Sequence, residues 1–205
     1  GDQGDRKQMK GGLWRLGIIV AMAAALSCHS PASLHENAIK HNLLGVKALQ
    51  GGRLDQAEAN FGLALEYNSD FSEPYNNLGL VYLSRGQERR AISMFKKALA
   101  LNPDFAEARN NLGYLLFRHG AYGDSARAFR RALEVDPSFV EARLNLVRAL
   151  VQLKEYEPAR KHALKCIELS PAVAEPYCEL ALVGLRRGEI DEAYRSLLRA
   201  IALDG

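Results

Sequence analysis

Apolar and small residues along most of this chain recur at the spacing of an amphipathic helix. Residues 72–105 contain two such stretches, separated by a short polar break, each with small or apolar residues on one face of a helix. In the first stretch these residues are Tyr75, Leu78, Gly79 and Tyr82. In the second they are Ala91, Phe95, Ala98 and Leu99. The pattern predicts a pair of helices packed through these faces.

The helix pair recurs along the chain with a period of 34 residues. Pro103, Pro137 and Pro171 keep this spacing and each ends a second helix, because proline cannot continue one. Gly86 marks the end of a first helix. A period in this range is typical of stacked helix–turn–helix units, none of which buries its apolar face alone. We therefore predict an all-α fold, an α–α superhelix (solenoid), whose function is carried by an extended surface.

These residues are the tetratricopeptide repeat (TPR) signature, and the chain resembles that family over residues 38–205. The five predicted repeats are 38–71, 72–105, 106–139, 140–173 and 174–205. Ser69 stands at a proline position in the first repeat. In the fourth, Val147 replaces the glycine of the first helix and Ala163 replaces the aromatic residue of the second. In the fifth, Gly184 stands where a bulky residue normally packs.

The second helix of the fifth repeat has an apolar face with no following element to cover it. Solenoids need a polar terminal cap to remain soluble. We therefore expect either that the chain is a fragment lacking a cap or a further domain, or that another molecule covers this face. The face consists of Ala193, Leu197, Ala200 and Ile201.

Residues 1–27 do not continue the repeat and have the form of a secretory signal peptide. Basic residues precede an apolar run, Leu16 to Leu26, which as a helix would span roughly 16 Å, about half of a bilayer core. A short apolar core after positive charge is typical of an export signal, and we predict Met9 as the true start.

The end of this segment resembles the lipobox of bacterial lipoproteins, in which a peptidase cuts before a cysteine that is then acylated. The sequence Ala24-Ala25-Leu26-Ser27-Cys28 predicts acylated Cys28, with residues 28–37 as a short tether and the periplasmic face of an outer membrane as the location. Two alternatives stay open here: ordinary cleavage that leaves Cys28 as an N-terminal thiol, and a membrane-spanning anchor.

Charge and chemistry favour a non-catalytic protein. The formal net charge is only +3, which gives no indication of nucleic-acid binding. Basic pairs such as Arg130-Arg131 fall on second helices and predict a solvated outer face, with a phospholipid-facing surface as the alternative. The five histidines are scattered, without metal-ligand spacing, and no phosphate loop is present. We expect no enzyme activity, cofactor or metal, a buried thiol at Cys166 and an unpaired thiol at Cys178.

The resemblance implies that the first helix of each repeat lines a concave groove. Nine of the ten residues at the ninth and twelfth places of the repeats are apolar, and such a strip predicts a protein or peptide partner. The sixth-place asparagines resemble a ladder that holds a peptide backbone; a purely structural role is the alternative. Glutamates at the second places argue against a clamp for a C-terminal carboxylate. The predicted groove residues are Asn77, Leu80, Leu83, Asn111, Tyr114, Phe117, Asn145, Val151, Leu182 and Leu185.

An exported, lipid-anchored TPR solenoid resembles the type IV pilus pilotins of the PilW, PilF and Tgl type. That resemblance implies binding to secretin subunits and assistance in their outer-membrane assembly. Two alternatives remain: a general cell-envelope adaptor for peptidoglycan enzymes or proteases, and the substrate-recognition arm of a truncated TPR-containing transferase.

Overall fold

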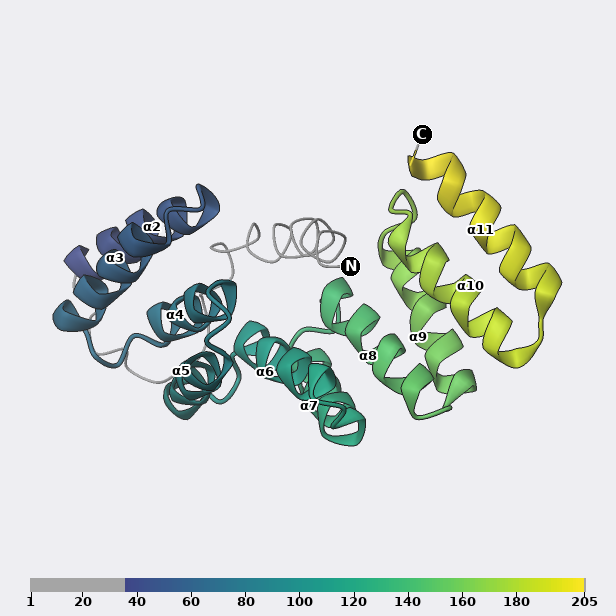
Figure 1. The fold of residues 1–205 in the computed structure, drawn as a ribbon, viewed down its shortest axis with the longest axis horizontal. Helices are drawn as coiled ribbons and strands as arrows, with labels where there is room; N and C mark the ends of the chain where they lie inside the picture. Colours follow the sequence, from purple (N-terminus) through teal and green to yellow (C-terminus); the bar gives the residue numbers. More distant parts are fainter. Residues whose placement is uncertain (1–35, 205) are drawn as a thin grey trace. The chain divides into compact units, whose positions relative to one another are not determined.

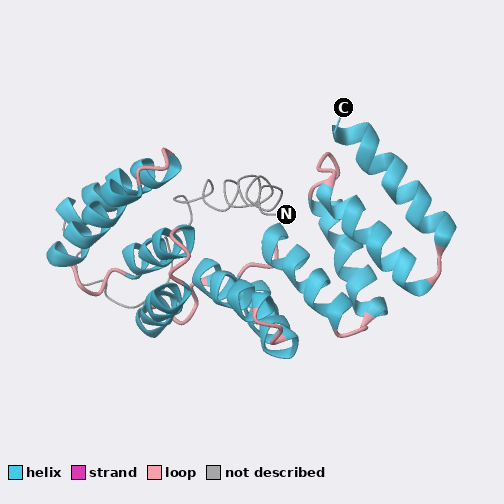
Figure 2. Ribbon diagram, in the orientation of Figure 1, coloured by secondary structure: helices cyan, strands magenta, loops and turns pink. Residues whose placement is uncertain are grey.

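The computed structural model describes residues 36–204, and every regular element in that range is an α-helix (Figure 2). The predicted all-α solenoid is confirmed. The predicted signal peptide, Cys28 and most of the tether lie outside the described residues, while residues 36 and 37 begin the first described helix. The described residues fall into two compact units, and the division lies between Pro74 and Tyr75.

The first unit contains a helical hairpin, α2 (Glu36–Gln50) and α3 (Leu54–Tyr67). His41 on α2 stacks on Tyr67 of α3 with ring centroids 5.6 Å apart, and its Nδ1 lies 3.2 Å from Oδ1 of Asn60. The buried side chains of Ala48, Ala57 and Phe61 complete the contact between the helices.

The second unit stacks its helices in chain order, each pair followed by the next (Figure 1). The first helices of the pairs are α4 (Ser72–Ser84), α6 (Ala106–Arg118), α8 (Val140–Gln152) and α10 (Glu175–Arg187). The second helices are α5 (Glu88–Leu101), α7 (Tyr122–Val135), α9 (Tyr156–Leu169) and α11 (Ile190–Asp204). Helix α4 begins three residues before the division between the units. The boundaries of the five repeats stay a prediction.

A residue in the left-handed conformation follows each first helix and starts the turn into the second. Glycine holds this place in four pairs, as at Gly86 (φ 74°) and Gly188 (φ 79°), because it has no Cβ to resist a positive φ. Lys154 takes the place in the fourth pair with φ 62°. A positive φ is uncommon for a residue with a side chain, so the turn after α8 carries strain that the other four lack.

Helices α5 and α7 pass into the next first helix through a turn built on a short polar side chain. After α5, Oδ1 of Asn102 accepts a hydrogen bond from the backbone N–H of Asp104 (3.1 Å). After α7, Oδ1 of Asp136 accepts the equivalent bond from Ser138 (2.8 Å). Asn and Asp side chains stabilise turns in this way, and together with the following proline they end the helix.

Within a pair, the glycine of the first helix receives an aromatic ring from the second. A Cβ on Gly79 would lie within 3.0 Å of the Phe95 ring, so no larger residue fits. Gly45 with Phe61 and Gly113 with Phe129 repeat the arrangement. In the fourth pair the larger side chain comes from the first helix instead. Val147 takes the glycine position, Ala163 takes the aromatic position, and both are fully buried in one cluster.

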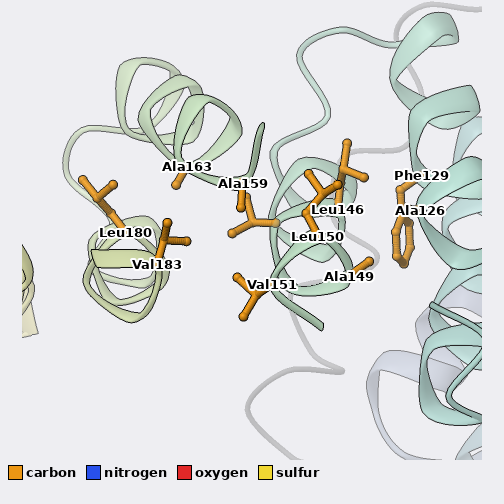
Figure 3. Close-up of a cluster of buried hydrophobic side chains, with 11 residues drawn as sticks. Ala126, Phe129, Leu146, Ala149, Leu150, Val151, Ala159, Ala163, Leu180 and Val183 are labelled. Carbon is orange, nitrogen blue, oxygen red and sulfur yellow. The ribbon is translucent and has the colours of Figure 1, made fainter. Parts of the chain in front are cut away.

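The largest buried cluster surrounds α8 and joins three consecutive pairs (Figure 3). Leu146 and Leu150 of α8 pack in this cluster with Phe129 of α7 and Val183 of α10. Each interface between neighbours therefore continues into the next one, as the repeat architecture requires. On α11, Leu197 and Ile201 remain exposed in the described structure, whereas Ala193 and Ala200 are buried.

Candidate interaction surface on the first helices

The first helices of the second unit lie close to one another, and the second helices do not. Helix α6 contacts α8, and α8 contacts α10, whereas α7 makes no comparable contact with α5 or α9 among the described residues. A stack in which one set of helices is closer together curves toward that set. The first helices therefore line the inner side of this unit, as the resemblance implied.

Two of the predicted groove residues, one on α6 and one on α10, leave apolar surface open on these helices. Tyr114 on α6 is 38% exposed and Leu185 on α10 is 50% exposed. Leu182 is half-buried and packs against the core cluster. Phe117 is also half-buried, and its ring lies 5.3 Å from that of Tyr122 at the start of α7. Leu80 on α4 is half-buried as well.

Leu83 and Val151, both predicted to lie in the exposed strip, are instead buried. Leu83 is 7% exposed and Val151 is 6% exposed. Val151 belongs to the core cluster, together with Val183 on the next first helix. The apolar surface of the inner side is therefore discontinuous, with its exposed parts on α6 and α10.

The sixth-place asparagines join neighbouring first helices. Nδ2 of Asn111 donates to Oδ1 of Asn76 on α4 (2.9 Å), and Nδ2 of Asn145 donates to Oδ1 of Asn110 on α6 (3.0 Å). All four of these side chains are buried. Asn77 is half-buried on α4. These contacts give Asn111 and Asn145 the structural role that the sequence left open as an alternative. Each Nδ2 group has a second proton that takes no part in these bonds.

Between α8 and α10, a charged network takes the place of the asparagine contacts that join the earlier first helices. The guanidinium of Arg148 donates to Glu179 (Nε to Oε1, 2.6 Å) and to Glu175 (Nη2 to Oε1, 2.6 Å), and also reaches Oδ1 of Asn145 (3.3 Å). Burial acts to lower the pKa of Arg148, but Glu179 and Glu175 raise it overall. Arg148 is the one polar residue among the ten ninth- and twelfth-place positions, and it ties two repeats together.

Glu141 at the start of α8 titrates near neutral pH. Burial raises the pKa of its carboxyl to about 7, against the opposing effect of the Asn110 side chain, whose Nδ2 donates to Glu141 Oε1 (3.1 Å). The carboxylates of Glu175 and Glu107 push the pKa in the same direction as burial. The inner side thus combines apolar surface with a row of carboxylates that repel one another.

Sequence reasoning missed the fifth-place partners Asn76 and Asn110, and it missed Glu179. A signal for them was present, because Asn76 and Asn110 are 34 residues apart and Glu179 takes the sixth place of the last repeat. Cys166 is buried and Cys178 is exposed, and both are free thiols as predicted.

Within residues 36–204, no helix is both long enough and apolar enough to cross a membrane. No group of three or more His, Cys, Asp or Glu side chains in that range has an arrangement suited to holding a metal ion.

The stacked pairs define a helical solenoid whose central part, within residues 81–164, consists of TPR-type repeats of the kind found in protein–protein interaction scaffolds. Models described as TPR repeat and tetratricopeptide repeat match residues 81–120 and 116–164, respectively. Among curated protein sequences, none matches this chain.

Solved structures share the fold at low sequence identity. A structure reported in a functional characterisation of Pseudomonas aeruginosa pilF has a TM-score of 0.76 and 22% identity, covering 83% of this chain and 78% of that one. A crystal structure of MamA has a TM-score of 0.68 and 24% identity, covering 78% and 94%. YrrB, described as a TPR protein with an unusual peptide-binding site, has a TM-score of 0.65 and 22% identity, covering 81% and 86%.

Proposed function

We propose that the inner side of the second unit binds a segment of another protein. The observation that carries this proposal is the apolar surface left open at Tyr114 and Leu185, since the other large apolar side chains on the first helices of the second unit are buried or half-buried. Aromatic and aliphatic side chains of this kind anchor peptides in helical grooves. The carboxylates between them add polar contacts that fix the orientation of the segment.

The more specific proposal is an outer-membrane lipoprotein that assists the assembly of a type IV pilus secretin. Two observations support it: the lipobox-like sequence that ends at Cys28, and a fold shared with the pilF structure. An acylated Cys28 would hold the protein at the periplasmic face of the membrane, because several acyl chains give stable anchoring.

Capture of the partner from cells that express the full chain tests the binding face. Tyr114→Glu combined with Leu185→Glu places two charges on exposed apolar sites and should lower recovery of the partner by about tenfold or more, since anchor residues dominate such interfaces. Val135→Glu, on an equally exposed apolar side chain of α7, is the matched control. Leu83 is unsuitable for this test because its substitution would disturb the core.

Mass spectrometry of crosslinked cells then identifies the partner. Recovery of a secretin that is lost in the Tyr114/Leu185 variant supports the specific proposal. Recovery of a peptidoglycan enzyme or a protease instead supports the general adaptor. Equal recovery by the parent, the double variant and the control contradicts binding through this face.

The lipid anchor is tested separately. Cells fed labelled palmitate should yield labelled protein that fractionates with membranes, and Cys28→Ala should abolish both the label and the fractionation. Labelling that persists in Cys28→Ala places the acyl chain elsewhere, and an unlabelled parent protein refutes acylation.

A further inference from the structure

A hollow of about 460 Å³ lies against α8 and α9, lined largely by basic side chains. Three lining residues carry a permanent positive charge, and one carries a negative charge: Glu168, whose Oε1 accepts a bond from Nζ of Lys165 (2.6 Å). Positive charge therefore exceeds negative charge around the hollow. The lining residues are Arg143, Lys161, His162, Leu164, Lys165 and Glu168.

Arg143 is the unusual member of this set, because its charge is nine-tenths buried without a counter-charge. The residue is 9% exposed, and its Nη2 donates to the carbonyl oxygen of Pro137. Its Nη1 lies 3.3 Å from Nδ1 of His162, and its Nε is buried without a hydrogen-bond partner. In the described part of the chain, no carboxylate forms an ion pair with it. A buried charge is costly unless an opposite charge compensates it.

His162 does not supply a negative charge beside Arg143. The pKa of its ring instead reflects the positive electrostatic potential in the hollow. Burial, and after it the positive charges of Arg143, Arg130 and Lys161, lower the pKa of its imidazole to about 4. The ring is therefore neutral at pH 7. Because Nη1 of Arg143 is a donor, Nδ1 of the neutral ring accepts, and the proton on Nε2 is a further donor.

We propose that this hollow is an anion site that binds the phosphate group of a small ligand or of a lipid head group. The bound phosphate supplies the counter-charge that the fold leaves out beside Arg143. Guanidinium groups match phosphate oxygens geometrically, while Lys161 and Lys165 add flexible ammonium donors at the rim. A free phosphate monoester and a phospholipid head group present the same oxygens, so one chemistry covers both sources. The proposal is independent of the inner face, which lies on other residues.

Nuclear magnetic resonance of the His162 ring in the full chain gives a direct readout. Inorganic phosphate and glycerol phosphate are titrated against chloride at equal ionic strength, which removes non-specific screening. Phosphate should raise the pKa of His162, because an anion beside the ring favours its protonated form. Vesicles of phosphatidylglycerol and of phosphatidylcholine test the lipid source by co-flotation.

The variant Lys161→Gln/Lys165→Gln should weaken phosphate binding by about tenfold or more, since it removes two charge-assisted contacts. Both lysines lie on the surface of α9, so this variant leaves the core intact. Arg143→Gln, by contrast, would change a buried side chain. Lys96→Gln/Lys97→Gln on α5 is the matched control and should bind as the parent does.

The outcomes separate cleanly. A rise in the His162 pKa with phosphate, without binding to vesicles, shows that the ligand is a soluble phosphate. Flotation with phosphatidylglycerol vesicles that is lost in the Lys161→Gln/Lys165→Gln variant shows that the ligand is a lipid head group. A His162 pKa that responds equally to phosphate and chloride, or equal loss of binding in the α5 control, overturns the proposal.

Discussion

At the scale of the residue, the fit between one glycine and one ring holds three of the helix pairs together. Phe95 is fully buried against Gly79, and the fourth pair reaches the same fit with Val147 against Ala163. Protein cores tolerate such exchanges when the total volume is conserved, and they are destabilised by either an excess or a void.

This complementarity predicts strong coupling between Gly79 and Phe95. Phe95→Ala alone should cost about 3–5 kcal/mol by leaving a cavity. Gly79→Val alone should cost about 1–3 kcal/mol or more, because the added methyl groups meet the ring. The double variant reproduces the fourth pair and should be more stable than either single variant in urea unfolding. Additive losses in this cycle would contradict the volume exchange.

At the scale of the element, α8 links the inner face to the core. It contributes Leu146 and Leu150 to the buried cluster, while Asn145 and Arg148 bind the neighbouring first helices on either side. The same helix begins with Glu141, whose pKa of about 7 makes the stability of this region depend on pH.

The direction of that dependence follows from the bound protons. Between the ordinary carboxyl value of 4.5 and the folded value of about 7, the folded state holds more protons at Glu141 than the unfolded chain does. The contribution of this group to stability therefore falls as pH rises through that range, and above it the loss is complete and no longer changes with pH. His162 acts oppositely, because its folded pKa of about 4 lies below the ordinary 6.5 and protein stability rises over that interval.

Comparison of Glu141→Gln with the parent separates the effect of the Glu141 carboxyl on the pH dependence of stability from the effect of His162. Glutamine keeps an oxygen that can accept from Asn110 and cannot ionise. At pH 8 the variant should be more stable than the parent by about 1–3 kcal/mol, and the difference should vanish near pH 4. Thermal or urea unfolding at both pH values measures it. A difference that is the same at both values would show that Glu141 is not the titrating group.

The order and type of the elements could be predicted from the sequence, because the period of 34 residues identifies both helices of every pair. The burial of individual side chains could not be predicted in this way. The place of Val151 in its repeat gives the direction in which it leaves the helix, but its burial depends on how closely α10 packs against α8. The spacing of 34 residues marks Asn76 and Asn110 as equivalent positions, but it does not show that Asn76 lies within hydrogen-bond distance of Asn111 on another helix.

At the scale of the whole molecule, the stability of a solenoid is approximately a sum over its repeats and the interfaces between neighbouring repeats. Substitutions on the inner face and in the basic hollow should therefore have local effects, and binding defects can be separated from unfolding. Arg143 and Arg148 illustrate this separation, because one helix presents the first to the hollow and the second to the inner face.

The paired fit of Gly79 with Phe95, and of Val147 with Ala163, also bears on how such a chain can evolve. Each fit is complete within one repeat, so duplication or exchange of an entire repeat preserves it. A crossover between the two helices of a repeat would instead join valine to phenylalanine or glycine to alanine, and would create either a clash or a void. This applies where the fourth repeat is one of the two partners, so the helix pair of that repeat is exchanged intact only through crossovers at its boundaries.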